Sequence, residues 1–230
     1  DQKYLSDTWE YNPETNSWRQ MDDFKGGARY YALGFGIDNY GYVGTGYNDN
    51  YLKDFYRFDP TAAAGSQWTI VNGFGGQKRQ GGTAFVIDGK AYVCGGQNNN
   101  SDVSDFWCFD PSAATPWTQL RDIANTSDDD YDDDYTSIVR SYGVSFVIDG
   151  KAYLTLGSTA GGSYYSNYWI YDPATDLWEG DDLTAFEGST RIHAVCFSTG
   201  TRGIVATGGS GSSSYFDDAW ELKPYEYEEE

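Results

Sequence analysis

Four arginines recur at equivalent places in the sequence and could recognise an anionic ligand. A phenylalanine follows each of them after six residues and a glycine after seventeen. Each arginine therefore opens one copy of a block of fixed length: Arg29, Arg79, Arg140 and Arg191. A guanidinium group can bind a carboxylate through two parallel hydrogen bonds, so these arginines could form an anion site. The same regularity suits a structural role, in which each arginine bonds carbonyls or an aspartate of a neighbouring repeat.

Tyrosine, asparagine and serine are concentrated in the loops that follow these blocks. Flat aromatic rings and amide donors suit the apolar faces and hydroxyl groups of sugars, although many protein surfaces have a similar composition. We therefore add seven loop residues to the four arginines as candidate ligand-binding residues: Tyr47, Tyr51, Asn98, Asn100, Tyr164, Tyr165 and Tyr215.

The sequence offers little for catalysis. His193 is the only histidine, and its place beside Arg191 predicts a packing residue of the core. The sequence has no G-x-S-x-G nucleophile motif, no phosphate-binding loop and no paired Cys/His spacing for a metal. We predict no catalytic residue, no metal site and no cofactor. Acid–base chemistry on a sugar, which needs only carboxylates, Arg and Tyr, stays available.

The charge of the chain restricts its partners. Its 230 residues carry a formal net charge of −20, which has the wrong sign for nucleic acid or anionic lipid. No run of eighteen apolar residues is present, so we expect no membrane insertion. The insertion NTSDDDYDDDYTS (125–137) is strongly acidic. Its carboxylates could bind Ca²⁺, but their order is not that of a defined calcium loop, and runs of like charge are usually solvated.

Each block is predicted to be a β-hairpin. In 79–96 and 140–157, two apolar runs are joined by Asp-Gly, which favours a type I′ turn. A polar loop and a heptapeptide such as DFWCFDP (105–111) follow, and aromatic residues alternate in it as in a half-buried strand. A tryptophan comes next. One unit is thus a four-stranded antiparallel sheet: hairpin strands a and b, heptapeptide strand c, and strand d with the tryptophan. We expect the block phenylalanines to be buried at matching depths: Phe35, Phe85, Phe146 and Phe197.

The three cysteines all lie in these predicted strands: Cys94, Cys108 and Cys196. Such positions favour free thiols that pack as small apolar residues, and an odd number leaves at least one cysteine without a partner. The cysteines therefore do not reveal the redox compartment.

The repeated unit resembles the kelch repeat, because DGKAYVCGG (88–96) and WIYDPATDLW (169–178) are similar to the consensus of bacterial kelch proteins. The resemblance implies an all-β, kelch-type β-propeller of four-stranded antiparallel blades. The alternative fold, a flat β-sandwich, would not need a hairpin of fixed length. The same superfamily includes galactose oxidase, but its copper site uses two His and two Tyr and cannot be assembled with one histidine.

Five units are recognisable in 1–230, which we interpret as a single propeller domain. Three units are complete: 29–68, 79–117 and 140–178. The first, 1–18, supplies only strands c and d. The last, 191–224, supplies a, b and c, and no tryptophan follows in 224–230. We therefore expect further sequence upstream of residue 1, and the sequence does not fix the total number of blades.

In such blades, the b–c and d–a loops emerge on one face, which we call the loop face. The leading hypothesis is a non-enzymatic binding or scaffold propeller that presents this face to a glycan or a protein partner. Resemblance to bacterial kelch sialic-acid mutarotases implies the alternative, a sugar-acid mutarotase or epimerase with Arg191 and Glu187 as a candidate pair. Carboxylates that converge on the mouth of the central channel, within reach of the arginines, would favour the enzyme, and a mouth of Tyr, Asn and backbone alone would favour binding. The resemblance also implies an exported protein (periplasmic, cell-surface or secreted); oligomeric state is not indicated.

Overall fold

The computed structural model describes residues 4–180 and 184–224, which form antiparallel β-sheets. Three sheets have four strands each, ordered along the chain. The first complete sheet contains β3 (Leu33–Ile37), β4 (Tyr40–Gly44), β5 (Phe55–Phe58) and β6 (Trp68–Val71). The second contains β7 (Thr83–Ile87), β8 (Lys90–Cys94), β11 (Trp107–Phe109) and β12 (Trp117–Gln119). The third contains β13 (Val144–Ile148), β14 (Lys151–Thr155), β15 (Trp169–Asp172) and β16 (Leu177–Glu179).

Two further sheets are incomplete, at the two ends of the chain. The first consists of β1 (Trp9–Asn12) and β2 (Ser17–Gln20), and the last of β17 (Val195–Ser198), β18 (Gly203–Ala206) and β21 (Ala219–Leu222). The predicted pattern of three complete units between two partial ones is therefore confirmed. The C-terminal stretch discussed above lies outside the described residues from residue 225 onward.

Short elements decorate the loops between these strands. Two small hairpins lie in b–c loops: β9 (Gln97–Asn98) with β10 (Ser101–Asp102), and β19 (Gly209–Ser210) with β20 (Ser214–Tyr215). A short 3₁₀ turn, η1 (Asp130–Asp132), lies in the acidic insertion. Across residues 4–180 and 184–224, no helix has the length and hydropathy to cross a membrane.

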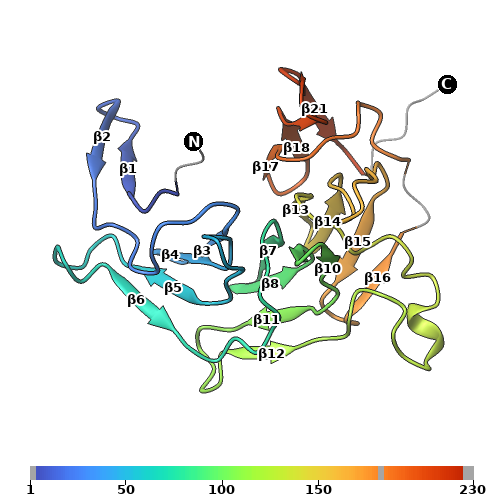
Figure 1. Ribbon diagram of the computed structural model, residues 1–230, viewed down its shortest axis with the longest axis horizontal. Coiled ribbons are helices and arrows are strands. Elements are labelled where there is room, and N and C mark those ends of the chain that lie inside the picture. The colour runs from blue at the N-terminus through green and yellow to red at the C-terminus, as the bar shows by residue number, and fades with distance from the viewer. Residues whose placement is uncertain (1–3, 181–183, 225–230) are drawn as a thin grey trace.

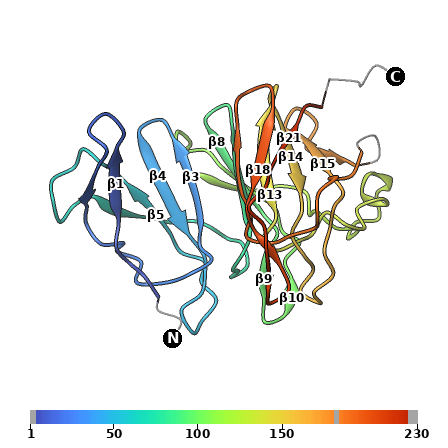
Figure 2. The same ribbon diagram turned by 90° about the horizontal axis from the view of Figure 1, so that it is seen from above.

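The sheets are arranged as blades around a common centre, with strand a of each blade innermost (Figure 1). β3 lies beside β7, β7 beside β13, and β13 beside β17. β1 and β2 stand at one end of this arc and β17, β18 and β21 at the other (Figure 1). This is the arrangement of a β-propeller. Figure 2 shows that β9 and β10 lie on the side opposite to the turns of the a–b hairpins.

The a–b turns form as predicted where Asp-Gly joins the strands. Asp88 and Gly89 have φ of 49° and 73°, and Asp149 and Gly150 have φ of 49° and 77°. Positive φ at both central residues is the geometry of a type I′ turn, whose twist matches that of the flanking strands. The blocks therefore fold as hairpins of one length and place their first residues equivalently.

The core lies between successive blades. Phe85 and Phe146 are 4% and 2% exposed, because each packs toward the following blade: Phe85, for example, has its ring centre 5.9 Å from that of Tyr171. Phe35 is half-buried. Phe197, however, is 58% exposed. The expectation of matching depths is therefore wrong for Phe197, because, among the described residues, no following blade packs over β17.

The three cysteines are free thiols in the structure, as expected. Cys94 is buried in β8, and burial raises the pKa of its thiol to about 12. Cys108 and Cys196 are half-buried in β11 and β17. These thiols pack as small apolar side chains and have little thiolate character at neutral pH.

Candidate functional site

The four block arginines act as clamps inside their blades. Each is at most 7% exposed. In every case Nε donates to the carbonyl two residues earlier and Nη1 donates to the carbonyl sixteen residues later. In the last blade these distances are 2.9 Å from Arg191 to Ser189 and 3.0 Å to Thr207. Each arginine thereby fastens the start of strand a to the end of strand b.

The clamp is completed by the residue that precedes strand c. Arg29, Arg79 and Arg191 form ion pairs there with Asp54, Asp105 and Asp218. In the third complete blade the corresponding partner of Arg140 is Asn167, whose Oδ1 accepts from Nη2 over 3.1 Å. Hydrogen bonds from the arginine and from Trp220 hold the pKa of Asp218 well below its usual range.

This geometry supports a structural role for the arginines, but their partners lie in the same blade, so the expectation of partners in a neighbouring repeat is wrong. Their N–H groups are directed to carbonyls and carboxylates within the blade, and burial encloses them. The geometry gives no support to the expected receipt of a ligand carboxylate by this set. The geometry also gives no support to the candidate acid–base pair, because the carboxylate partner of Arg191 is Asp218 and Glu187 is an exposed residue.

An aromatic cluster lies where the blades meet, built from the residues two positions after the arginines. Tyr31 and His193 stack with ring centres 5.0 Å apart and planes 10° apart. Tyr142 contacts both, at 4.9 Å and 4.5 Å between ring centres. The three side chains come from three different blades and converge beside their innermost strands. We call Tyr31, Tyr142 and His193 the axial cluster.

Glutamine side chains hold Tyr142 in the axial cluster. Its hydroxyl accepts hydrogen bonds from Nε2 of Gln80 (2.9 Å) and of Gln97 (2.8 Å). Gly81 occupies the equivalent position of the second complete blade, and a Cβ there would overlap the Tyr142 ring. A glycine is therefore needed at 81 so that the tyrosine of the next blade can reach the centre.

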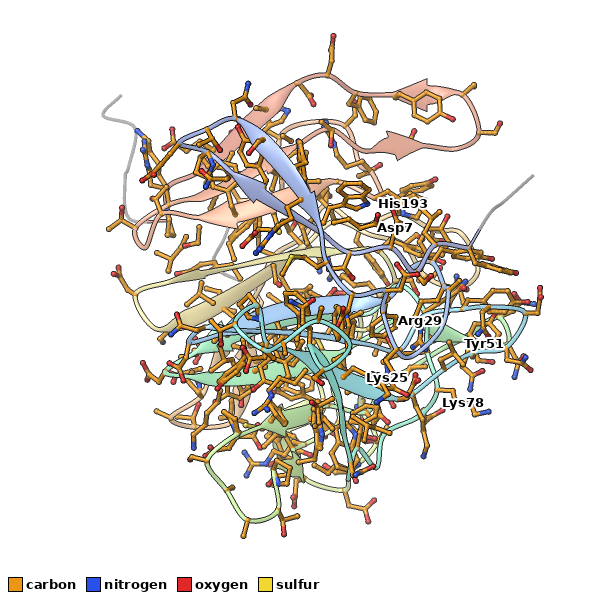
Figure 3. The ribbon with its side chains drawn as sticks, turned by 90° about the vertical axis from the view of Figure 1, so that its left-hand side faces the viewer. Asp7, Lys25, Arg29, Tyr51, Lys78 and His193 are labelled. Atoms are coloured by element: carbon orange, nitrogen blue, oxygen red, sulfur yellow. The ribbon has the colours of Figure 1, made fainter. Side chains whose placement is uncertain are left out.

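Further tyrosines extend the axial cluster across the loop face. Tyr30 packs edge-on against Tyr31 at 4.6 Å and lies 5.5 Å from Tyr47, which in turn lies 5.0 Å from Tyr51. Figure 3 shows Tyr51 and His193 on the same side of the molecule. Two predicted residues, Tyr47 and Tyr51, thus belong to a continuous surface. We call it the aromatic surface, and its members are Tyr30, Tyr31, Tyr47, Tyr51, Tyr142 and His193.

The other predicted loop residues have different surroundings. The ring of Tyr165 covers Arg140, with the guanidinium carbon 4.6 Å from the ring centre. The hydroxyl of Tyr164 accepts a hydrogen bond from the backbone of Gly211 (2.8 Å) and so links two b–c loops. Tyr215 is 82% exposed in β20. Asn98 lies in β9 and Asn100 in the turn that follows it. Tyr215, Asn98 and Asn100 remain candidate contacts at the rim of the loop face.

The axial cluster is uncharged at neutral pH. Partial desolvation by its neighbours lowers the pKa of His193, and desolvation raises that of Tyr142 to about 12. The imidazole is therefore neutral and can both donate and accept a hydrogen bond. A ligand here would therefore meet aromatic faces, hydroxyl groups and amides.

The backbone of the acidic insertion wraps around the carboxylate of Asp132. Asp132 has 0% exposure and accepts hydrogen bonds from the backbone N–H groups of Thr126 and Ser127, both over 2.9 Å. Its oxygens are thereby directed to the loop itself. In the part of the chain that the structure describes, no group of three or more His, Cys, Asp or Glu side chains is placed to hold a metal ion.

The axial cluster is the part of the site that we did not predict. His193 was expected in the core, but it is exposed and stacks on Tyr31. The sequence does contain a signal: the rigid block begins Arg-Tyr-Tyr, Arg-Ser-Tyr and Arg-Ile-His in three of its copies. Equivalent positions in a ring of blades must converge at the axis, so aromatic residues just after the arginines indicate a central cluster.

The fold and the repeats together define a β-propeller of kelch repeats. A model of the kelch motif matches residues 78–120. The solved structure of YjhT, a kelch β-propeller, is similar with a TM-score of 0.69 and 17% identity; the likeness covers 90% of this chain and 73% of that one. The protein is thus a kelch-type β-propeller, as the sequence predicts.

Two curated proteins are similar in sequence. N-acetylneuraminate epimerase of Yersinia enterocolitica is 28% identical over 192 residues, which are 69% of this chain and 47% of that protein. Kelch-like protein 15 of Danio rerio is 25% identical over 181 residues, which are 75% of this chain and 29% of that protein. The chain therefore spans less than half the length of either relative.

Proposed function

We propose that the protein is a non-enzymatic binding propeller that receives a glycan on the aromatic surface. Uncharged rings can stack on the apolar face of a sugar, while the hydroxyls of Tyr47 and Tyr51 and the neutral imidazole of His193 can bond its hydroxyl groups. The carboxylates that reach the arginines are held in clamps within the blades, which supports a binding role. Export, implied by the family resemblance, would expose this surface to external glycans.

The backbone of the axial cluster carries this proposal. Tyr31, Tyr142 and His193 all have left-handed φ, between 53° and 58°, a conformation that non-glycine residues rarely adopt. The equivalent residue of the second complete blade is Gly81, with φ of 62°. Each residue held in this backbone conformation destabilises the fold by roughly 1–3 kcal/mol, and such residues cluster at functional sites. Aromatic rings thus occupy positions where the same fold accepts a glycine, which we attribute to ligand binding.

A variant that separates strain from recognition tests the proposal. Glycine at both exposed positions, Tyr31→Gly with His193→Gly, should preserve or raise the melting temperature and abolish binding of any glycan that a glycan array identifies. The matched control is Asp88→Gly, which relieves a left-handed residue in an a–b turn, away from the loop face. It should leave binding unchanged. Binding by the double variant with wild-type affinity would refute the proposal, as would recognition of a protein partner but no glycan.

A second candidate function rests on the similarity to N-acetylneuraminate epimerase. In that case, the protein would catalyse exchange between the anomers of an acidic sugar. Proton NMR of freshly dissolved N-acetylneuraminate, with and without the protein, decides between the two. Under the binding proposal the protein leaves the exchange rate unchanged. A rate that rises in proportion to protein concentration would favour the enzyme.

A further inference from the structure

A cleft lies between the acidic insertion and the outer strands of the third complete blade. The insertion lies at the outer edge of the propeller, beside β16 and away from its centre (Figure 1). The cleft has a volume of about 260 Å³ and is lined by Tyr131, Asp134, Tyr135, Trp169, Trp178, Glu179 and Gly180. We call it the outer cleft. It shares no residue with the aromatic surface and is therefore a separate candidate site.

Aromatic side chains form most of the wall of the outer cleft. Tyr131 and Tyr135 come from the insertion, whereas Trp169 lies in β15 and Trp178 in β16. The ring centre of Tyr135 lies 5.9 Å from those of both Tyr131 and Trp169. The planes of the two pairs are nearly perpendicular, at 79° and 77°. Rings at such angles can surround a compact group from more than one side.

These side chains are held in place before a ligand arrives. The backbone N–H of Trp178 donates to the hydroxyl of Tyr135 over 2.7 Å, and Nε1 of Trp169 donates to Oγ of Ser137 over 3.2 Å. Gly180 leaves room for the Trp169 ring, because a Cβ at this position would lie 2.9 Å from carbon atoms of that ring. Little conformational freedom is therefore lost when a ligand enters the cleft.

Two carboxylates of the outer cleft are available to a ligand. Asp134 and Glu179 are exposed, and neither forms an ion pair with another described residue. Asp134 belongs to the insertion and Glu179 to β16, so both walls carry negative charge. The net charge of −20 adds a long-range attraction for cations.

One lining ring already contacts a cation. The guanidinium carbon of Arg121 lies 4.7 Å from the ring centre of Tyr131, and Nη1 of Arg121 donates to the carbonyl of Thr175 over 3.2 Å. Arg121 is thereby fixed outside the cleft lining, because it is not among the residues that line the cavity. The contact shows that positive charge is accepted at this part of the wall.

The composition of the wall favours an organic cation over a metal ion. Ca²⁺ takes about six to eight oxygen ligands, and among residues 4–180 and 184–224 no group of three or more His, Cys, Asp or Glu is placed to hold a metal. A primary ammonium is strongly hydrated, whereas a quaternary ammonium loses little hydration and is attracted to aromatic faces. We propose that the outer cleft binds the quaternary ammonium group of a small organic cation, with Asp134 and Glu179 as counter-ions.

Choline and an uncharged molecule of the same shape test the chemistry of the ligand. In dimethylbutanol a carbon atom replaces the choline nitrogen, so the shape is retained and the charge is lost. Calorimetry should show saturable binding of choline and at least tenfold weaker binding of dimethylbutanol. Equal affinities would mean that the cleft recognises apolar shape alone and would overturn the proposal. Failure of both choline and tetramethylammonium to bind would also overturn it.

Variants of the lining residues locate the binding. Asp134→Asn with Glu179→Gln should weaken choline binding at least tenfold, and Tyr131→Leu should do so without a change of charge. The matched control is Asp129→Asn with Asp133→Asn, which removes two exposed carboxylates of the same insertion that do not line the cleft. It should change the affinity less than twofold. Equal weakening by the two carboxylate pairs would indicate general attraction to the insertion and would contradict the proposed site.

A vesicle experiment distinguishes a free cation from a lipid headgroup. Phosphatidylcholine vesicles present the same quaternary ammonium beside a phosphate, which the exposed carboxylates of the insertion should repel. We therefore expect choline to bind and the vesicles not to sediment with the protein. Sedimentation that is lost in Asp134→Asn with Glu179→Gln would support the same cleft and assign the headgroup as its ligand.

The outer cleft and the aromatic surface can be tested separately. Tyr31→Gly with His193→Gly should bind choline with wild-type affinity, because these residues lie outside the cleft. Loss of choline binding in this variant, with the fold intact by circular dichroism, would place the cation at the aromatic surface and refute the outer cleft as its site.

Discussion

Arg140 donates to the amide oxygen of Asn167 over 3.1 Å, in the place where the arginines of the other three clamps meet a carboxylate. Arg140 is 1% exposed, and burial lowers its pKa to about 10. Among the described residues, the charge is therefore offset by backbone carbonyls, by the amide oxygen of Asn167 and by the ring of Tyr165. A buried cation without a counter-ion is destabilising, so this clamp should be the weakest of the four.

Restoring the carboxylate should strengthen this clamp. We predict that Asn167→Asp raises the free energy of unfolding by about 1–3 kcal/mol at neutral pH, because a hydrogen bond to a charged group is stronger than one to an amide. Ser137 Oγ now accepts from the Asn167 amide over 2.7 Å and can rotate its hydroxyl to donate to the new carboxylate. Urea denaturation measures the change.

The matched control is the reverse substitution in the preceding blade. Asp105→Asn replaces the carboxylate that binds Arg79 and also accepts from Gln77 N–H over 2.7 Å. It should lower the free energy of unfolding by an amount of the same order. Equal stabilities for wild type, Asn167→Asp and Asp105→Asn would show that the clamps do not depend on the carboxylate.

Two phenylalanines at equivalent positions should respond differently to truncation. Phe146→Ala removes a ring that is 2% exposed and packs against the next blade, and should cost about 3–5 kcal/mol. Phe197→Ala removes a ring that is 58% exposed and should change the stability by only about 0.5 kcal/mol. Thermal unfolding of the two variants provides the comparison. A large loss from Phe197→Ala would mean that another element covers this ring in solution.

Alkaline pH should unfold the protein through its buried tyrosines. Burial raises the pKa of Tyr92, Tyr168 and Tyr171 above the value of about 10 found in unfolded chains. The folded state thus holds these protons longer, so the associated stability is fully present below pH 10 and is lost as the pH rises through the folded pKa values. Tyrosine ionisation at 295 nm should coincide with loss of the circular dichroism signal. Ionisation of all tyrosines in a folded protein would contradict this.

The sequence was sufficient to predict the repeat, and with it the blades and the a–b turns, because these depend on local spacing. It left the role of arginines such as Arg79 open and placed their structural partners in a neighbouring repeat, whereas the structure places them in the same blade. Burial depended on neighbours in space. Phe197 has the same local sequence pattern as Phe146, yet its exposure follows from its place in the last blade. The axial contacts of Tyr31 with His193 join residues 162 positions apart, so only the arrangement of the blades around a common centre brings them together.

The imidazole of His193 gives the most direct test of the aromatic surface as the ligand site. As the single histidine, it contributes one resolvable Hε1 resonance to the NMR spectrum. Titration with a glycan that binds the protein should shift this resonance with the same dissociation constant that calorimetry gives, and Tyr31→Gly should weaken both. Calorimetric binding that leaves the His193 resonance unmoved would place the ligand elsewhere and contradict the proposed site.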